Sequence, residues 1–164
     1  MSNMEAIIKA HNHRLSTPQQ ATARTCNCPR TKPCPLNGQC LTKNIIYTAT
    51  VTDKDNENNE KVYIGMCETA FKDRFYNHNM SLKNRRYESK TELSKYIWSL
   101  KDNNTNYEIK WSIYKKTPGY SNISKRCGLC TAEKVAIITF PNKNKLLNKR
   151  TELISKCRHE TSSC

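Results

Sequence analysis

The sequence predicts an α+β fold, in which a small, mainly antiparallel three-stranded sheet is flanked by helices and by cysteine-rich segments. Three observations predict it. Runs rich in Ile, Tyr, Thr and Val at about 44–52 and 61–66 enclose a polar insert, which indicates a hairpin. Residues 107–113 alternate in polarity like a third strand. Between these strands, apolar residues recur with helical spacing at about 69–80 and 90–102.

The two predicted helices have distinct faces. In the first helix, Phe71 and Phe75 are four residues apart and are expected in the core. Arg74 and His78, also four apart, share a neighbouring face. The second helix has an apolar stripe, and residues 89–92 have the pattern of a capping box at its start. One face of the first helix can therefore pack against the core, while the other is available for a functional site.

Composition divides the 164-residue chain into one compact domain and its flanks. The N-terminal flank is polar and Ser/Thr/Pro/Gln-rich, and the C-terminal flank is predicted to contain helices at about 132–140 and 145–157. From the N-terminus, the parts are a linker or disordered lead-in (1–25), a cysteine-rich loop (26–43), the sheet-and-helix domain (44–118) and a basic helical extension (119–164).

The chain is strongly basic, with 28 Lys and Arg against 14 Asp and Glu and a net charge of +14. This charge favours a polyanionic partner and leaves DNA, RNA and anionic membrane surfaces open. No run approaches the roughly 20 apolar residues of a membrane span, and the start has no apolar run of signal-peptide length. We therefore expect an intracellular protein that is not secreted and has no membrane partner.

The first cysteine group has the pattern C-x-C-x5-C-x5-C, interrupted by prolines and a glycine that exclude a helix or strand. In a reducing compartment such spacing more often indicates metal than disulfides. A structural zinc ion would supply the folding free energy that so short a loop cannot obtain by burial. The alternative is free or redox-active thiols. The predicted zinc ligands are Cys26, Cys28, Cys34 and Cys40.

A second zinc site is predicted in the C-terminal flank. It begins with a C-x2-C pair, in which both thiols can reach one metal at a turn, and closes with a C-x-H pair. In the alternative, Cys157 is only a residue at a helix end. The predicted ligands of this Cys3His site are Cys127, Cys130, Cys157 and His159.

Taken in order, the tyrosines, the Arg/His pair and a following glutamate resemble the GIY-YIG nuclease family over about residues 44–114. Gly65 matches the family's second motif, whereas Ile45 stands where the first motif has glycine. Together with the cysteines of the lead-in and the tail at 156–159, the chain resembles the endonuclease region of Penelope-like retroelements over most of its length. The residues that carry the nuclease likeness are Tyr47, Tyr63, Arg74, His78 and Glu92.

The resemblance implies a metal-dependent DNA endonuclease that cleaves or nicks target DNA for retroelement integration. One of the two tyrosines would position or deprotonate water, Arg74 would hold the scissile phosphate, and His78 would relay a proton or bind an adjacent phosphate. Glu92 would bind one Mg²⁺ or Mn²⁺. Duplex DNA, a reverse transcriptase encoded by the same element and a nuclear location follow as expectations. The basic residues expected to contact DNA are Lys83, Arg85, Arg86 and Lys90.

Two alternatives belong to other functional classes. A catalytically decayed or domesticated copy would be a zinc-stapled nucleic-acid-binding module without turnover. An RNA-binding module could instead use Trp98, Trp111 and the tyrosines as stacking faces. Magnesium-dependent nicking separates the enzyme from the first alternative, and competition between single-stranded RNA and duplex DNA separates it from the second.

Overall fold

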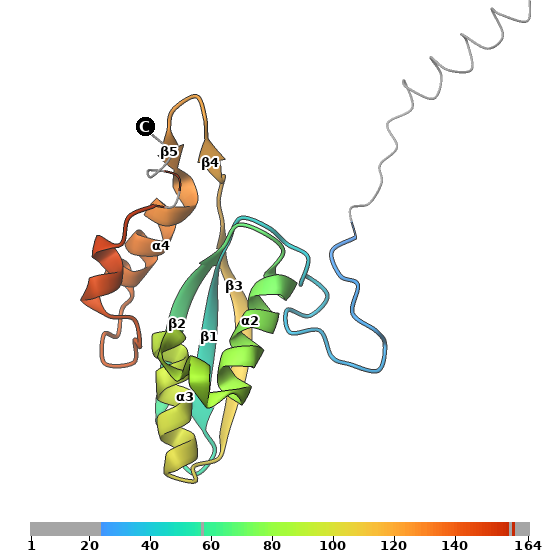
Figure 1. Cartoon of the computed structure of the whole chain (residues 1–164), viewed down its shortest axis with the longest axis vertical. Coiled ribbons are helices and arrows are strands. Elements are labelled where there is room, and N and C mark those ends of the chain that lie inside the picture. The colour runs from blue at the N-terminus through green and yellow to red at the C-terminus, as the bar shows by residue number, and fades with distance from the viewer. Residues whose placement is uncertain (1–23, 57, 158, 160–164) are drawn as a thin grey trace, which may run out of the picture.

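The computed structural model describes residues 24–56, 58–157 and 159, so most of the lead-in predicted at 1–25 lies outside the described residues. The described chain forms a sheet with helices and a small second hairpin (Figure 1). In chain order the elements are β1 (Ile45–Asp53), β2 (Glu60–Cys67), α2 (Phe71–Lys83), η1 (Arg85–Lys90), α3 (Glu92–Asp102), β3 (Tyr107–Lys116), β4 (Tyr120–Ser121), β5 (Arg126–Cys127), α4 (Gly128–Thr139) and η2 (Arg150–Ile154).

The main sheet has the order β2-β1-β3, and both pairings of the central strand β1 are antiparallel. In this register Tyr47 lies opposite Gly65 on β2 and opposite Ile113 on β3. The pairing with β3 shifts between Ile46 and Tyr47, where the strand is irregular. The predicted α+β fold with a three-stranded antiparallel sheet is confirmed.

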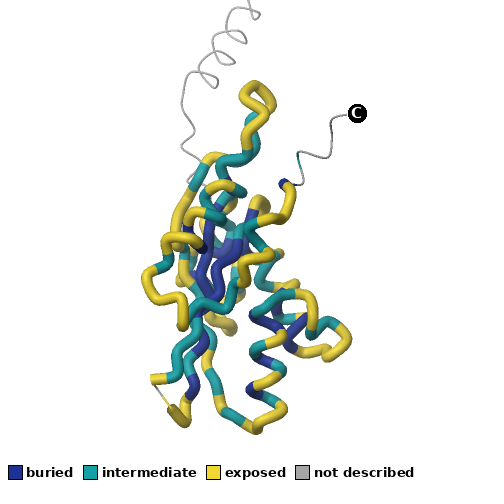
Figure 2. The backbone as a smooth tube through the Cα atoms, turned by 90° about the vertical axis from the view of Figure 1, so that its left-hand side faces the viewer, coloured by how far each residue is buried: buried dark blue, intermediate teal, exposed yellow. Residues whose placement is uncertain are grey.

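Both faces of the sheet are covered, which is why β1 is buried along most of its length (Figure 2). Alternate residues of a strand point to opposite faces. Tyr47 and its same-face neighbours pack with Phe71 of α2 and with Leu93 and Ile97 of α3. Ile46 packs on the other face with Leu129 and Ile137, from α4. The sheet therefore separates two apolar cores, one under α2 and α3 and one under α4.

Two helix starts differ from the prediction. Helix α3 begins at Glu92 behind a capping box in which Thr91 and Ser94 bond each other's backbone N–H, while 85–90 forms the separate 3₁₀ element η1. The capping box thus lies two residues further along the chain than predicted, with Thr91 and Ser94 in the places expected for Ser89 and Glu92. Helix α4 begins at Gly128 instead of about 132, because the Cys127 sulfur accepts the N–H of Cys130.

The predicted helix at 145–157 is wrong. Residues 145–147 run along the outer edge of β2, where the Val62 N–H donates to the Lys145 carbonyl at 2.7 Å. The Leu147 N–H donates to the Val62 carbonyl at 2.8 Å. These backbone groups complete the edge strand instead of forming helical bonds, so the segment keeps only the short element η2.

Within the described residues, no helix combines the length and the apolar character that crossing a membrane requires.

Candidate active site and metal centres

Tyr47 is the centre of a buried polar triad at the sheet–α2 contact. Its hydroxyl lies 2.7 Å from His78 Nε2, and it accepts a hydrogen bond from Arg74 Nε at 3.1 Å. Tyr47 is fully buried and His78 is 2% exposed. The predicted four-residue spacing of Arg74 and His78 thus brings both side chains of α2 to one phenol of β1.

Both Tyr47 and His78 are neutral near pH 7. Burial, only partly opposed by the Arg74 charge, raises the pKa of Tyr47 to about 12. Burial, with the Arg74 charge adding to it, lowers the pKa of His78 to about 3. We assign the acceptor nitrogen of the neutral imidazole to Nε2, because the phenol oxygen already accepts from Arg74 and can then donate its hydrogen to His78.

Gly65 makes room for the Tyr47 ring. A Cβ atom built on Gly65 would lie 2.4 Å from the Tyr47 hydroxyl oxygen and 2.6 Å from the ring carbon that carries it. Any side chain here would push the phenol away from Arg74 and His78. The glycine of the second motif therefore serves close approach of a tyrosine side chain to the β2 backbone.

Tyr63, the second predicted tyrosine, supports the triad from the side. It is 5% exposed, and its ring centroid lies 5.9 Å from that of His78 in an edge-on arrangement. Burial raises the pKa of Tyr63 well above its usual range. It belongs to the same core as Tyr47 and packs against His78, and like Tyr47 it lines neither of the cavities that Arg74 lines.

Two cavities meet at Arg74 and Asn77, which line both of them. The larger, of about 550 Å³, also has His78, Tyr87 and Lys90 in its wall. The smaller, of about 280 Å³, lies on the side of α4 and of the second cysteine group. Among the described residues, no carboxylate lines the larger cavity, whereas three line the smaller one: Glu68, Asp73 and Glu133.

Glu133 of α4 is a carboxylate that the fold brings to the cavity lined by Arg74, and it is not among the residues predicted from the sequence. Burial, followed by the charge of Glu152, raises the pKa of Glu133 to about 7, while the Arg74 charge opposes the rise. A signal was present in the sequence, because Glu133 shares a helical stripe with Leu129 and Ile137, which are both buried. A glutamate on the buried stripe of an apolar helix is unusual, because a buried carboxylate needs a partner to offset its loss of hydration.

Asn148 connects Glu152 to the strand that carries Tyr63 and Gly65. Its side-chain oxygen accepts the Ile64 N–H at 2.7 Å, and its amide donates to the Ile64 carbonyl at 2.8 Å. The same amide donates to the Glu152 carboxylate at 2.6 Å. The C-terminal segment is thereby held beside the site by an element that local sequence patterns did not indicate.

Glu92 is not brought to this site. Its carboxylate bonds Lys95 at 2.8 Å and Lys149 at 3.1 Å, and it lines neither of the cavities that Arg74 lines. Although partial burial acts in the other direction, these two lysines lower the pKa of Glu92. The start of α3 therefore points the predicted metal ligand Glu92 toward two lysines, and the described structure does not bring its carboxylate to the cavities beside Arg74.

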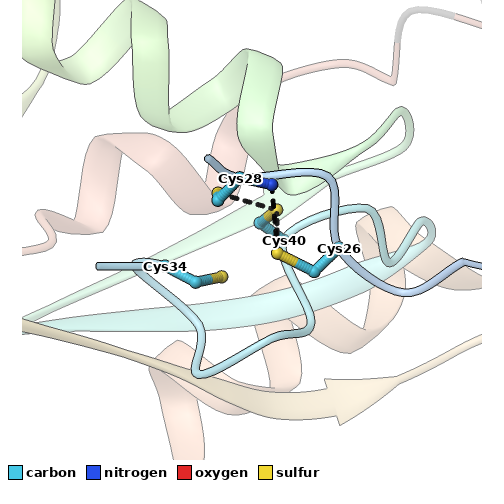
Figure 3. A group of neighbouring side chains, drawn as sticks. All are labelled: Cys26, Cys28, Cys34 and Cys40. Atoms are coloured by element: carbon cyan, nitrogen blue, oxygen red, sulfur yellow. Dashed lines mark hydrogen bonds between the residues drawn. The ribbon is translucent and has the colours of Figure 1, made fainter. Parts of the chain in front are cut away.

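The four cysteines of the first group converge, as Figure 3 shows. All four sulfur atoms lie within 4.8 Å of one another, and the Cys40 sulfur lies 3.6 Å from those of Cys26 and Cys28. A tetrahedral zinc site with Zn–S bonds of about 2.3 Å requires sulfur separations of about 3.8 Å. Gly38 supplies the left-handed backbone of the connecting turn with φ +88°. This group could hold zinc as predicted.

The second group gathers three of its four predicted ligands. Cys127, Cys130 and Cys157 lie within 4.8 Å of one another, with the last two sulfurs 3.3 Å apart. His159 is outside the group: its Nε2 lies 3.1 Å from a Glu68 carboxylate oxygen, and its ring stacks on Tyr120 at 4.4 Å. The three thiols could hold zinc, and no disulfide joins the described cysteines.

The four basic residues predicted to contact DNA are all exposed, but they differ in their surroundings. Arg85 makes a bidentate pair with Asp102, with both N–O distances 2.9 Å. Lys90 lines the larger cavity, next to Arg74 and His78. Lys83 is the last residue of α2 and Arg86 lies in η1, and both are exposed. Of the four, Lys90 is the one that faces the candidate active site.

Comparisons of this chain with protein-family models, with curated proteins and with solved structures give no match.

Proposed function

We propose that this protein is a metal-dependent DNA endonuclease of the GIY-YIG type, which nicks or cleaves target DNA for integration of a Penelope-like retroelement. The observation that carries the proposal is the hydrogen-bonded triad of Tyr47, Arg74 and His78 beside a cavity lined by Glu133. The net charge of +14 suits duplex DNA as substrate. A nuclear location and a reverse transcriptase of the same element as partner belong to this proposal.

Arg74 is the phosphate-binding group in this mechanism. It is permanently charged, and its planar fork matches the geometry of a phosphate. The Nε–H bond to Tyr47 fixes the guanidinium at the junction of the two cavities. A scissile phosphate bound there is held by the guanidinium that bonds the phenol, and it shares the smaller cavity with the Glu133 carboxylate.

Tyr47 orients the attacking water and passes on its proton. The phenol oxygen takes a proton from water as the water oxygen bonds to phosphorus, and the phenol hydrogen moves to His78 Nε2. The bond between phosphorus and the 3′ oxygen breaks, and the departing 3′ oxygen takes a proton from solvent water. A neutral phenol whose pKa is about 12 does not act as a phenolate near pH 7, so this coupled transfer is required. A bound phosphate would offset the Arg74 charge that helps to keep the pKa of His78 low.

Glu133 would hold a single Mg²⁺ or Mn²⁺. Its carboxylate is partly buried near Glu152, and a divalent cation relieves the unfavourable charge that raises its pKa to about 7. When bound, such an ion neutralises charge on the phosphate and on the departing 3′ oxygen. The chain's own part is to hold the carboxylate on α4 in the wall of the cavity that Arg74 also lines.

Nicking of supercoiled plasmid by zinc-loaded protein, with and without added Mg²⁺, tests the proposal. We expect nicking that requires Mg²⁺ and that falls by about 100-fold or more in Glu133→Gln and in Arg74→Lys. Glu92→Gln is the matched control and should nick within a few-fold of the wild type. DNA binding without any nicking would instead identify the zinc-stapled binding module, and nicking that depends on Glu92 would overturn the assignment of Glu133.

A further inference from the structure

The larger cavity beside the triad has properties that the hydrolytic residues do not explain. It measures about 550 Å³, within the range of about 300–1,000 Å³ typical of small-molecule sites. It starts at Arg74 and His78 and extends along α2 to η1 and the start of α3. The hydrolysis proposed above requires only the Arg74 end of this space.

The charges of the two cavities differ in a way that assigns them different ligands. The smaller cavity is lined by three carboxylates and suits a cation. Of the described residues that line the larger cavity, none is acidic, while Arg74 and Lys90 are both cationic. The nearby glutamates Glu88 and Glu92 are engaged by Arg85 and by two lysines. The larger cavity therefore suits an anion.

An aromatic ring adds a second feature. Tyr87 lines the cavity, and Lys90 Nζ lies 5.9 Å from the centroid of its ring. The backbone of η1 kinks at Tyr87, with φ −105° and ψ 15°. A cation and an aromatic ring in one anion-binding cavity fit a nucleotide, whose phosphate and base they would contact respectively.

We propose that this cavity binds the nucleotide next to the scissile phosphate, with its base unstacked from the duplex and placed on Tyr87. The inference rests on the proposed function for the identity of the scissile phosphate, which Arg74 holds. Lys90 contacts the next phosphate along the strand, and the Asn77 side chain offers amide groups to the base edge. Unstacking one base costs a few kcal/mol, which stacking on the tyrosine offsets.

The test measures binding of thymidine 3′,5′-bisphosphate to the full zinc-loaded chain without magnesium, by calorimetric titration. We expect Tyr87→Ala to weaken binding by about ten-fold or more. Tyr87→Phe retains the ring and should stay within about two-fold, while Lys90→Ala should weaken binding several-fold. Tyr114→Ala, a substitution of an exposed tyrosine that lines a different cavity, is the matched control and should bind normally.

A second ligand isolates the base. Binding of 2-deoxyribose 5-phosphate, which has no base, should be equally weak in wild type and Tyr87→Ala. Equal bisphosphate affinity of wild type and Tyr87→Ala, or no bisphosphate binding at all, overturns the inference even if plasmid nicking is observed. Tyr87-dependent binding by a protein that does not nick DNA would uphold the nucleotide site while refuting the proposed hydrolysis.

Discussion

The two cysteine groups each stand at the start of a helix that carries candidate catalytic residues, but they hold these helices differently. Helix α2, with Arg74 and His78, has no side-chain cap. Its first amides donate to the Thr42 and Cys40 carbonyls of the first cysteine loop, at 3.1 and 2.8 Å. Helix α4, with Glu133, is instead capped by the sulfur of Cys127, itself one of the second group.

The first cysteine group therefore supports a helix from outside the candidate site, whereas the second forms part of the wall of the smaller cavity. The first group reaches α2 through backbone carbonyls at the end of its loop, and of its four cysteines none lines either cavity beside Arg74. The three cysteines of the second group line the smaller cavity together with Glu133 and Arg74. Loss of zinc from the first group should therefore cost mainly stability, whereas loss of zinc from the second should move Glu133, the carboxylate that we propose to be catalytic.

The largest expected effect compares one cysteine from each group in plasmid nicking. Cys130→Ser should lower the rate by about 100-fold or more, because the ordered start of α4 positions Glu133. Cys34→Ser should lower it by less than about ten-fold at a temperature where the variant is folded. Elemental analysis should find about two zinc ions in the wild type and one in each variant.

Circular dichroism at the assay temperature serves as the control for folding of both variants. Equal loss of nicking in the two variants would show that both groups act only through global stability. Wild-type protein without zinc and with intact disulfides would refute both metal assignments and the reducing compartment.

The next prediction concerns which residues of the second group hold the metal. Cys157→Ala should abolish zinc binding at this site, whereas His159→Ala should weaken it by less than about ten-fold, because His159 bonds Glu68 and stacks on Tyr120. The measurement is competition with a zinc chelator of known affinity. If both variants lose the metal equally, His159 turns from Glu68 to the thiols when zinc binds, as its C-x-H spacing predicts.

The contrast between the two groups also explains which parts of the fold the sequence could predict. The ligands of the first group lie within fifteen residues of one another, so their spacing alone predicted the set. Tyr47, Arg74 and His78 followed from strand and helix periodicity together with the family resemblance, and the structure joins them by hydrogen bonds. Local spacing was sufficient for the cysteine set and for the Arg74/His78 pair, whereas the link to Tyr47 came from the resemblance.

Glu133 and the segment at 145–157 could not be predicted in the same way. Glu92 matched a local capping pattern and the expected order of motifs, and only the packing of α4 against β2 shows that Glu133 lies nearer Arg74. The segment at 145–157 has helical composition, but its backbone groups pair with Val62, more than eighty positions earlier. Pairings at such separation leave no trace in local periodicity.

A smaller effect distinguishes the two glutamates by pH. The pKa of Glu133 is raised to about 7, so the folded state binds more protons than the unfolded state between about pH 4.5 and 7, and stability falls as pH rises through this window. Glu133→Gln does not titrate. It should therefore gain about 1 kcal/mol over the wild type between pH 6 and pH 8 in urea unfolding of zinc-loaded protein.

Glu92→Gln is the control with the opposite sign. In the wild type the pKa of Glu92 is lowered by folding. Its contribution to the free energy of unfolding is therefore present above the ordinary carboxyl pKa and is lost only in acid. The variant should be a few tenths of a kcal/mol less stable than the wild type at both pH values. Acid destabilisation from buried His78 is common to all three proteins and cancels in the comparison. If both variants gained stability over the wild type between pH 6 and pH 8, the pH dependence would not come from the Glu133 carboxylate.

The smallest expected effect tests how the first cysteine loop is held to α2. Besides the two backbone bonds, Lys72 Nζ donates to Asn27 Oδ1 at 2.6 Å on the exposed side of this contact. A double-mutant cycle of Lys72→Met and Asn27→Ala, measured by urea unfolding of zinc-loaded protein, should give a coupling energy of about 0.5 kcal/mol. Zinc content and nicking should stay at wild-type values, because Asn27 bonds the Cys40 sulfur through its backbone, which the substitution keeps, and neither residue lines a cavity beside Arg74. A coupling near zero would show that the backbone bonds from Cys40 and Thr42 alone join the metal loop to the helix. A coupling well above 1 kcal/mol, accompanied by loss of zinc, would show that the first group depends on side-chain contacts as the second does.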